Sequence, residues 1–356
     1  MKRTKKTKKS SFKKFVIAFF LLAFIGTTVT VYELYSRIFQ PNIIYSNAHD
    51  ERYIYIPSNS SFSEVITILS KHGMLININS FEWLAKQKKY HTQIKSGKYK
   101  IDRALNNNEL IDLLRSGRQS PVNISFNNLR TIEQLASKVS FQIEADSISI
   151  LNHMLDSVFL KKIDFNKENV ACIFLPNTYQ FFWDTSAEEF VERMLKEYNY
   201  FWNSKRNNQA KNINLSNIEI SILASIVEKE QTIKADERST IAGLYLNRLK
   251  KNMKLESDPT LIFALGDFSI KRVLNKDKKV NSLYNTYKYI GLPPGPICLP
   301  SINSIDAVLN AESNDFIFMC AKEDFSGYHN FSRTYVKHLI NARKYHNALN
   351  KRNILR

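Results

Sequence analysis

The amino-acid sequence predicts an α+β protein whose first helix spans a membrane. Three observations support this fold class. A run of 18 residues without a charged side chain follows a basic N-terminal tail, and short β-prone runs alternate with segments of helical periodicity. In addition, 44% of the 356 residues are hydrophobic and 12% are aromatic. That composition suffices for about two folded domains and excludes a wholly disordered chain.

The uncharged run is Phe15–Tyr32. As a helix with a rise of 1.5 Å per residue it spans about 27 Å, which is enough to cross the hydrocarbon core of a bilayer. A cleaved signal peptide is the alternative. No small-x-small cleavage site follows the run, so we predict a retained signal anchor over residues 15–35.

The net charge of +18 is the feature that could indicate a nucleic-acid-binding protein. However, eight cations lie within the first 14 residues, and no acid precedes Glu33. By the positive-inside rule, this basic tail (residues 1–14) stays in the cytoplasm and the chain beyond about residue 35 lies outside the plasma (inner) membrane. No compact stretch interleaves basic with aromatic residues, so we expect no nucleic-acid partner.

The cysteines and glycines exclude several classes of site. The spacing of Cys172, Cys298 and Cys320 matches no zinc site, and three cysteines cannot staple a small disulfide scaffold. Cys172 and Cys320 lie in apolar runs, so we expect buried free thiols there. The chain has nine glycines and neither a GxGxxG nor a Walker pattern. We expect no metal and no cofactor.

A strand–turn–helix unit recurs at an offset of 45 residues. In the first copy, the β-prone run Tyr53–Ile56 leads through a turn into the helical segment Phe62–Leu69, with Ser61 and Glu64 as a capping box. The second copy leads from Tyr99–Ile101 into Glu109–Leu114, and a weaker third copy leads from Ile124–Phe126 into Thr131–Val139. Units of this size are either glycan-binding modules or parts of a compact α+β domain.

Aromatic side chains gather at Phe181-Phe182-Trp183, just before a predicted helix start at Thr185–Glu188. Such rings could stack on sugars in a cleft, although core packing is the more frequent reason for an aromatic cluster. Farther along, Lys205–Lys211 is polar and basic, and we predict a loop between two lobes there.

The segment Ile218–Gln231 predicts a buried helix that carries a carboxyl group on its apolar side. Ile222, Leu223, Ile226 and Val227 share one arc at 100° per residue. Glu228 is predicted at the polar edge of that arc and Glu230 in its middle, provided that the helix continues to residue 230. Burial raises the pKa of a carboxyl group, and general-acid cleavage of a glycosidic bond needs such a group. Alternatively, the helix ends at Lys229 and Glu230 is solvated.

A second amphipathic helix is predicted over Asp236–Lys251, with Ile241, Leu244, Tyr245 and Leu249 inward. Three segments rich in hydroxyl groups, amides and prolines follow, and we predict loops suited to hydrogen-bonding a polyol. They are Leu255–Thr260, Tyr284–Tyr287 and Gly291–Pro296.

Five motifs in this order resemble those of the YceG-like family, the membrane-anchored endolytic murein transglycosylases. They are Ala224-Ser225-Ile226-Val227-Glu228-Lys229-Glu230, Asn247-Arg248-Leu249, Ser257-Asp258-Pro259-Thr260, Tyr284-Asn285-Thr286-Tyr287 and Gly291-Leu292-Pro293-Pro294-Gly295-Pro296. The resemblance continues through Phe316–Phe331. There are departures, with Ala171-Cys172 where the family often has Glu-Gly, Asn177 in place of Asp, and Cys298-Leu299 after the proline-rich loop.

The resemblance implies a LysM-like module over residues 50–118 and a lysozyme-like, mixed α+β catalytic domain over residues 119–350. It implies that Glu230 is the catalytic acid and then the base in cleavage of the β-1,4 bond between N-acetylmuramic acid and N-acetylglucosamine. The product has 1,6-anhydro ends, and the reaction would terminate elongation of nascent peptidoglycan strands, together with cell-wall synthases. Substrate is expected to bind at Gln231, Glu237, Asn247, Ser257, Asp258, Asn285 and Tyr287.

Two other classes of function stay open from the sequence. A muramidase, which is a hydrolase, would use Glu230 together with Glu237 or Asp258 as base or nucleophile. A non-catalytic membrane protein would hold peptidoglycan without cleaving it.

Overall fold

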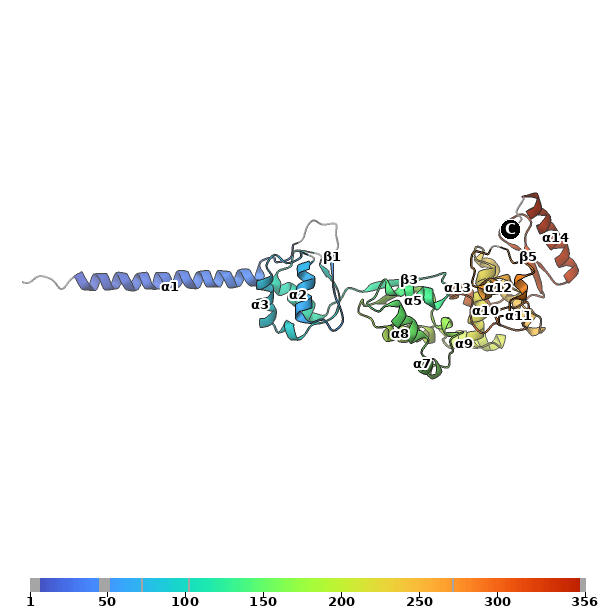
Figure 1. The fold of residues 1–356 in the computed structure, drawn as a ribbon, viewed down its shortest axis with the longest axis horizontal. Coiled ribbons are helices and arrows are strands. Elements are labelled where there is room, and N and C mark those ends of the chain that lie inside the picture. The colour runs from blue at the N-terminus through green and yellow to red at the C-terminus, as the bar shows by residue number, and fades with distance from the viewer. Residues whose placement is uncertain (1–6, 45–51, 72, 102, 271, 353–356) are drawn as a thin grey trace, which may run out of the picture. The chain divides into compact units, whose positions relative to one another are not determined.

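The computed structural model describes residues 7–44, 52–71, 73–101, 103–270 and 272–352 (Figure 1). The chain forms two compact units. Unit 1 comprises Met1–Val122 with Phe182–Asp184, and unit 2 comprises Asn123–Phe181 with Thr185–Arg356. Helices predominate in both, and the strands form two-stranded sheets, so the predicted α+β class is confirmed at this level.

Helix α1, Thr7–Phe39, contains the predicted membrane span. Its segment Phe12–Phe39 has a mean hydropathy of 2.2, and its most apolar stretch is not buried at all within the protein. Three threonines in it donate hydrogen bonds to helix carbonyl groups: Thr27 and Thr28 to Phe24, and Thr30 to Gly26. Because these hydroxyl groups are satisfied within the helix, they can lie in lipid without an unpaired polar atom. The helix is therefore long and apolar enough to cross a membrane.

Unit 1 beyond α1 is a two-stranded antiparallel sheet covered by short helices. Strands β1 and β2 pair antiparallel, with Ile56 opposite Gly97. The elements are β1 (Arg52–Ile56), α2 (Phe62–Lys71), α3 (Ile78–Gln87), η1 (Tyr90–Thr92), β2 (Gly97–Ile101) and α4 (Asn107–Ser116). Ile54, Leu69 and Leu114 are among the fully buried residues of its core.

The predicted repeat of 45 residues is confirmed in unit 1 down to its helix caps. Ser61 and Glu64 exchange the two hydrogen bonds of a capping box ahead of α2. Asn106 and Glu109 do the same ahead of α4, so each helix start has its first free N–H groups satisfied in the same way. The third copy also forms a strand and a helix, but these lie in unit 2.

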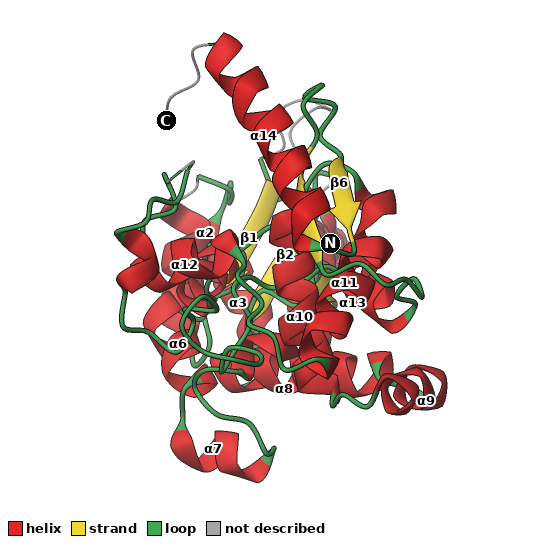
Figure 2. Cartoon of the chain, turned by 90° about the vertical axis from the view of Figure 1, so that its right-hand side faces the viewer, coloured by secondary structure: helices red, strands yellow, loops and turns green. Residues whose placement is uncertain are grey.

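Unit 2 starts from the pair β3–β4 and continues as packed helices. Its elements are β3 (Val122–Phe126), α5 (Ile132–Ser140), α6 (Ser147–Met154), α7 (Ser157–Lys162), η2 (Val170–Ile173), β4 (Asn177–Phe181), α8 (Ala187–Phe201), α9 (Ser204–Ile213), α10 (Asn217–Glu230), η3 (Ala235–Glu237), α11 (Arg238–Lys250), α12 (Asp258–Leu265), η4 (Asp277–Lys279), α13 (Ile302–Leu309), β5 (Phe318–Ala321), β6 (His329–Ser332) and α14 (Tyr335–Lys351). Helix α10 contacts α9, α11, α12 and α13. Helix α14 lies against the antiparallel β5–β6 pair (Figure 2).

Of the three aromatic residues at 181–183, Phe181 belongs to the core, Phe182 is exposed and Trp183 is partly buried. Phe181 and Phe174 both pack against Phe190 of α8, with ring centroids 5.3 and 6.3 Å apart. Trp183 packs edge-on against Tyr55 within unit 1. Ser186 caps α8 as the predicted helix start at Thr185–Glu188 requires.

The prediction of a loop at Lys205–Lys211 is wrong, because these residues lie within α9. These residues are almost all polar, so they form no apolar stripe along a helix. The sequence pattern alone therefore indicates a solvated loop. Tertiary contacts supply what the pattern lacks. Arg206 forms two hydrogen bonds with the carboxylate of Asp306, at 3.0 and 3.2 Å, and Ala210 is buried. Asn203 caps the helix start by accepting a bond from the N–H of Arg206.

Two further boundaries differ from prediction. Asp258-Pro259-Thr260 was predicted as loop, yet these residues form the first turn of α12, where proline is tolerated because no helical N–H is needed. Helix α11 begins at Arg238, because Asp236 and Glu237 before it belong to the 3-10 helix η3.

The inward side of α11 is mostly as predicted. Ile241, Leu244 and Tyr245 are buried. Leu249 is only partly buried, while Arg248 is buried.

Candidate active site

Helix α10 places one carboxyl group at the end of a fully packed segment. A capping box between Ser216 and Glu219 starts the helix, and its last residue is Glu230. Leu223, Ile226 and Val227 have no exposed surface, since neighbouring helices surround this part of the chain. The helix thus continues past Lys229, against the alternative that it ends there, and Glu230 is partly buried.

The two acids at this end of α10 have different surroundings. Glu228 was predicted at a polar helix edge, but it is buried, with 7% of its surface exposed. Its Oε2 accepts hydrogen bonds from the backbone N–H and the hydroxyl of Ser301, and from the hydroxyl of Ser304. These donors lie at the start of α13, which packs against α10. The positive end of α13 thus satisfies this carboxylate, and we assign it a structural role.

Glu230 faces a cavity and is held through one of its two carboxyl oxygens. The hydroxyl of Tyr245 donates a 2.7 Å hydrogen bond to Oε1, and the hydroxyl of Ser257 donates a 2.5 Å bond to the same atom. Within the described chain, no residue donates a hydrogen bond to Oε2. Because both hydrogen bonds go to Oε1, Oε2 is free to carry a proton.

The cavity has a volume of about 250 Å³ and is lined mainly by polar groups. It lies where α10, α11, α12 and the β5–β6 pair meet. The lining residues are Glu230, Leu244, Tyr245, Arg248, Leu255, Glu256, Asp258, Tyr287, Met319, Cys320, Ala321 and His329.

Burial raises the pKa of Glu230 above its ordinary value. The hydrogen bonds from Ser257 and Tyr245 oppose this shift and the negative charge of Asp258 adds to it, but the net direction is upward. Burial and the charge of Glu230 also raise the pKa of Tyr245 well above 10, so that its hydroxyl stays a donor. Glu230 therefore has the properties of a general acid: a raised pKa, a fixed orientation and one open oxygen.

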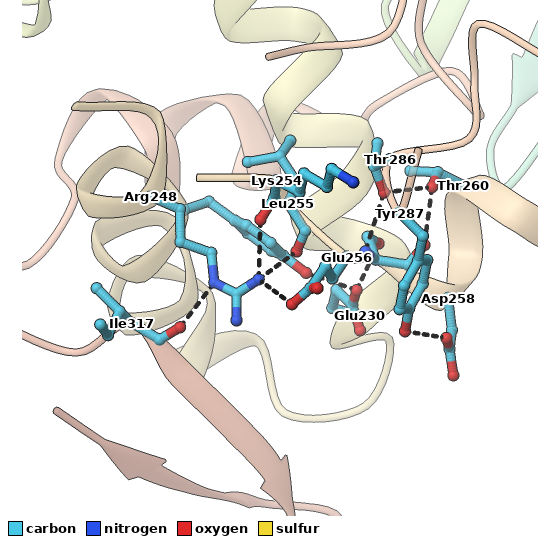
Figure 3. Close-up of polar contacts among 12 residues, drawn as sticks. Glu230, Arg248, Lys254, Leu255, Glu256, Asp258, Thr260, Thr286, Tyr287 and Ile317 are labelled. Carbon is cyan, nitrogen blue, oxygen red and sulfur yellow. Dashed lines mark hydrogen bonds and ion pairs between the residues drawn. The ribbon is translucent and has the colours of Figure 1, made fainter. Parts of the chain in front are cut away.

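Hydrogen bonds connect the motifs Ser257–Thr260 and Tyr284–Tyr287, and these bonds position Ser257. The backbone N–H of Ser257 donates to the hydroxyl of Thr286 at 3.0 Å, and the hydroxyls of Thr286 and Thr260 lie 2.8 Å apart. Tyr287 then donates a 2.6 Å hydrogen bond to Oδ1 of Asp258, beside Glu230 (Figure 3). Of the predicted substrate-binding residues, Asp258 and Tyr287 line the cavity, and Ser257 contacts the acid directly.

The other predicted substrate-binding residues hold the surrounding chain. The side-chain amide of Asn247 donates to the carbonyls of Asn314 and Phe316. The amide of Asn285 donates to the carbonyls of Lys278 and Val280. Neither residue lines the cavity.

Gln231 and Glu237 lie beside the cavity and contact each other. Gln231 Nε2 donates to Oε2 of Glu237 at 2.6 Å and to the carbonyl of Gly327. Glu237 also binds His329, which does line the cavity.

Sequence reasoning missed Arg248 as a residue of this site, although it belongs to one of the quoted motifs. Its guanidinium donates to the carbonyls of Lys254, Leu255 and Ile317 and to the carboxylate of Glu256 (Figure 3). Glu256 has a left-handed backbone with φ of 52°. The hydrogen bonds of the buried Arg248 guanidinium hold the strained turn at Glu256, and this turn brings Ser257 to Glu230.

His329 and Cys320 were also missed as cavity residues. Cys320 was predicted to be buried, which is wrong, since it is partly exposed; Cys172 is buried as predicted. The reason is that Cys320 lies on β5, and one face of this strand borders the cavity. A run of apolar residues in the sequence predicts instead that both faces of the strand are buried. The only available signal for His329 was its place in the resembling segment Phe316–Phe331.

The residue that follows the proline-rich motif, Ile297, contacts α10. The backbone N–H of Ile297 donates to the hydroxyl of Ser225 at 3.0 Å. A Cβ atom at Gly295 would lie 1.8 Å from the carbonyl oxygen of Glu168, so only glycine fits this approach. In the part of the chain that the structure describes, no group of three His, Cys, Asp or Glu side chains is arranged to hold a metal ion.

An acid that has a raised pKa and is held by two hydroxyl groups at a polar cavity is suited to acid–base catalysis. The sequence model of the YceG-like family matches residues 54–344. The chain therefore belongs to the YceG-like family.

Named relatives agree with this membership. The chain is 30% identical over 315 residues to the endolytic murein transglycosylase of Bacillus subtilis, covering 84% of this chain and 86% of that protein. It is 27% identical to the endolytic murein transglycosylase of Streptococcus pneumoniae strain R6, a longer protein of which 55% is covered. A crystal structure of a YceG-like protein from Listeria monocytogenes superimposes with a TM-score of 0.56 at 29% identity, covering 82% of this chain and 98% of that one.

Proposed function

We propose that this chain is a membrane-anchored endolytic murein transglycosylase that cleaves the bond between N-acetylmuramic acid and N-acetylglucosamine and leaves 1,6-anhydro ends. The observation that carries the proposal is the state of Glu230. Its pKa is raised by burial, and two hydroxyl groups hold one oxygen while the other faces a cavity. The names of the relatives add the substrate class.

In the first step, protonated Glu230 donates its proton from Oε2 to the glycosidic oxygen. The bond to the anomeric carbon breaks and an oxocarbenium-like sugar forms. The carboxylate that remains is stabilised by the hydroxyls of Ser257 and Tyr245, which already point at Oε1. Because these donors need no reorientation, they favour the state in which Glu230 is charged.

In the second step, the same carboxylate takes the proton of the C6 hydroxyl group, whose oxygen bonds to the anomeric carbon. The 1,6-anhydro ring closes and Glu230 is protonated again, so protons balance over the cycle. One carboxyl group suffices, and no water is consumed.

A muramidase is the second candidate, because Asp258 lies in the same cavity as Glu230. It would act as the base for a water molecule or as the nucleophile. Glu237, the other acid considered for this role, is occupied by Gln231 and His329 and does not line the cavity. Asp258 is therefore the residue to test.

Mass analysis of the products distinguishes the two reactions. Purified sacculi are digested with the wild-type chain and the soluble fragments are weighed. Ends lighter by one water than hydrolysed ends support the lyase, and exclusively hydrolysed ends contradict it. Glu230→Gln should abolish product formation, while Glu192→Gln, which removes an exposed acid of α8, should retain it. Asp258→Asn should still yield anhydro ends if the lyase assignment is right.

The remaining assignments concern placement and partners. We propose that α1 is retained as a single-pass anchor of the plasma (inner) membrane, with residues 1–14 in the cytoplasm and both units outside it, because the cations precede the apolar run. Residues 50–118 would act as a LysM-like module that binds glycan strands, and residues 119–350 as a lysozyme-like catalytic domain. Cleavage of nascent strands beside cell-wall synthases would then terminate their elongation. Protease added outside intact spheroplasts should degrade both units, and protection of them would contradict this topology.

A further inference from the structure

Glu237 and His329 form a polar pair at the wall of the cavity that contains Glu230. The carboxylate of Glu237 accepts a 2.9 Å hydrogen bond from the backbone N–H of His329 and lies 2.7 Å from its ring Nδ1. Gln231 donates a third bond at 2.6 Å. The side chains of Glu237 and His329 are 7% and 15% exposed. One carboxylate thus holds both the backbone and the ring of His329, which fixes the direction of the ring.

These contacts decide which ring nitrogen carries the proton. Burial raises the pKa of Glu237, but the hydrogen bonds from His329 and Gln231 outweigh this effect and the net direction is downward. Glu237 is therefore a carboxylate and can only accept. Nδ1 of His329 must then be the donor, and in the neutral form of the ring Nε2 is an acceptor.

The free nitrogen belongs to the wall of the cavity. His329 starts strand β6 and lies opposite Ala321 of β5, and both residues line the cavity with Glu230. Within the described chain, no hydrogen bond is made to Nε2. The sugars of peptidoglycan carry hydroxyl groups and acetamido N–H groups, which are the donors that such an acceptor requires.

We propose that Nε2 of His329 accepts a hydrogen bond from a hydroxyl or acetamido N–H group of the bound glycan, and that Glu237 is a positioning residue that holds the ring in this state. The inference deepens the proposed function and rests on it for the substrate class. Glu237 thereby acts on the substrate through His329.

The protonation state is tested on the wild-type protein by ¹⁵N NMR of the histidine rings, with the His329 signals assigned by their loss in His329→Gln. We expect a protonated Nδ1 and an unprotonated Nε2. In Glu237→Gln, the amide can donate to Nδ1 and should move the proton to Nε2. A proton on Nε2 in the wild-type protein would overturn the proposal, and this outcome does not depend on the folding of Glu237→Gln.

The binding role is tested by titrating glycan oligosaccharides into the non-cleaving Glu230→Gln protein. Adding His329→Gln should weaken binding about tenfold, the loss expected for one hydrogen bond to a fixed partner. Adding Glu237→Gln should weaken it similarly, and the two changes together should cost no more than either alone. Unchanged affinity in the His329→Gln protein, or losses that multiply, would overturn the proposal.

The matched control is His338→Gln. This histidine of α14 stacks on Phe318 with ring centroids 5.3 Å apart and does not line the cavity. Its replacement should leave glycan affinity unchanged. The same series in otherwise wild-type protein should raise KM about tenfold with little change in kcat. The proposed reaction would be contradicted by the chemistry of the product ends. The present inference would be contradicted by the glycan affinity or by the protonation of the ring, so the two failures are distinguishable.

Discussion

The hydroxyl of Ser257 donates a 2.5 Å hydrogen bond to Oε1 of Glu230, although the two residues are 27 positions apart. Ser257 comes just before α12 and Glu230 ends α10, so the contact exists only because these elements pack together. The bond favours the carboxylate over the acid, whereas burial favours the acid. The acid is thus available for the first proton transfer and its anion is stabilised afterwards.

Replacing Ser257 with alanine should lower kcat and move the pH profile. The hydroxyl stabilises the carboxylate formed in the first step, and a hydrogen bond to a charged group is worth a factor of about 10–100 in rate. Removing the donor also raises the pKa of Glu230 further. Since activity requires protonated Glu230, the alkaline limb of the profile should move to higher pH. Tyr245→Phe should shift it in the same direction.

The matched control for this profile is Ser304→Ala, which removes a buried hydroxyl from Glu228, the neighbouring acid on α10. In this variant the alkaline limb of the pH–activity profile should lie at the same pH as in the wild-type protein, because Glu228 does not line the cavity. A limb that moves to lower pH in Ser257→Ala would contradict the assigned role of the hydroxyl.

Glu230→Gln should make the protein more stable at neutral pH. The folded-state pKa of Glu230 is raised, so the stability that its neutral form contributes is fully present below the ordinary value of 4.5 and is lost as the pH rises through the folded value. Glutamine cannot ionise and avoids this loss. Thermal unfolding of both proteins from pH 4 upward measures the difference. It should be small at the acid end and grow with pH in favour of the variant; a constant difference would show that Glu230 is not desolvated.

Arg248→Lys should destabilise unit 2 by about 3 kcal/mol, because an ammonium group cannot replace the guanidinium fork that satisfies three carbonyls and one carboxylate. We expect the unfolding temperature, followed by loss of activity, to fall by about 5–10 °C. Arg193→Lys provides the comparison, since the exposed pair of Arg193 with Glu197 is worth less than about 1 kcal/mol. Equal shifts in the two variants would mean that the Arg248 contacts do not hold the turn.

Cys320 should be the first thiol to react with an alkylating reagent. It lines the cavity, whereas Cys172 and Cys298 are buried, and burial raises the pKa of Cys298 to about 12. Mass spectrometry of the native protein should show one fast adduct, which is absent in Cys320→Ser. Bound glycan oligosaccharide should slow this adduct. Equal labelling of all three thiols without denaturant would contradict the burial of the other two.

Several features followed from the sequence because they depend on residues that are close along the chain. The apolar run of α1, the capping box before α2 and the start of α8 are all local patterns, and the structure has them as predicted. Helical periodicity likewise placed Glu230 on the same side of its helix as the buried Leu223 and Val227, although Glu230 itself is partly exposed and the polar position predicted for Glu228 is wrong. These predictions hold because period and caps are fixed by backbone geometry.

The tertiary structure alone decided what the two acids at the end of α10 contact. Periodicity gives the direction of a side chain from the helix axis but not the neighbour that it meets. The start of α13 supplies donors to Glu228, while Glu230 meets two hydroxyl groups and a cavity. For the same reason, the helix at Ser204–Ile213 depends on the distant Asp306, and His329 reaches the cavity from a strand late in the chain. The sequence determined the helix on which both carboxyl groups lie, and the packing of distant elements determined that Glu228 is buried and that Glu230 faces the cavity.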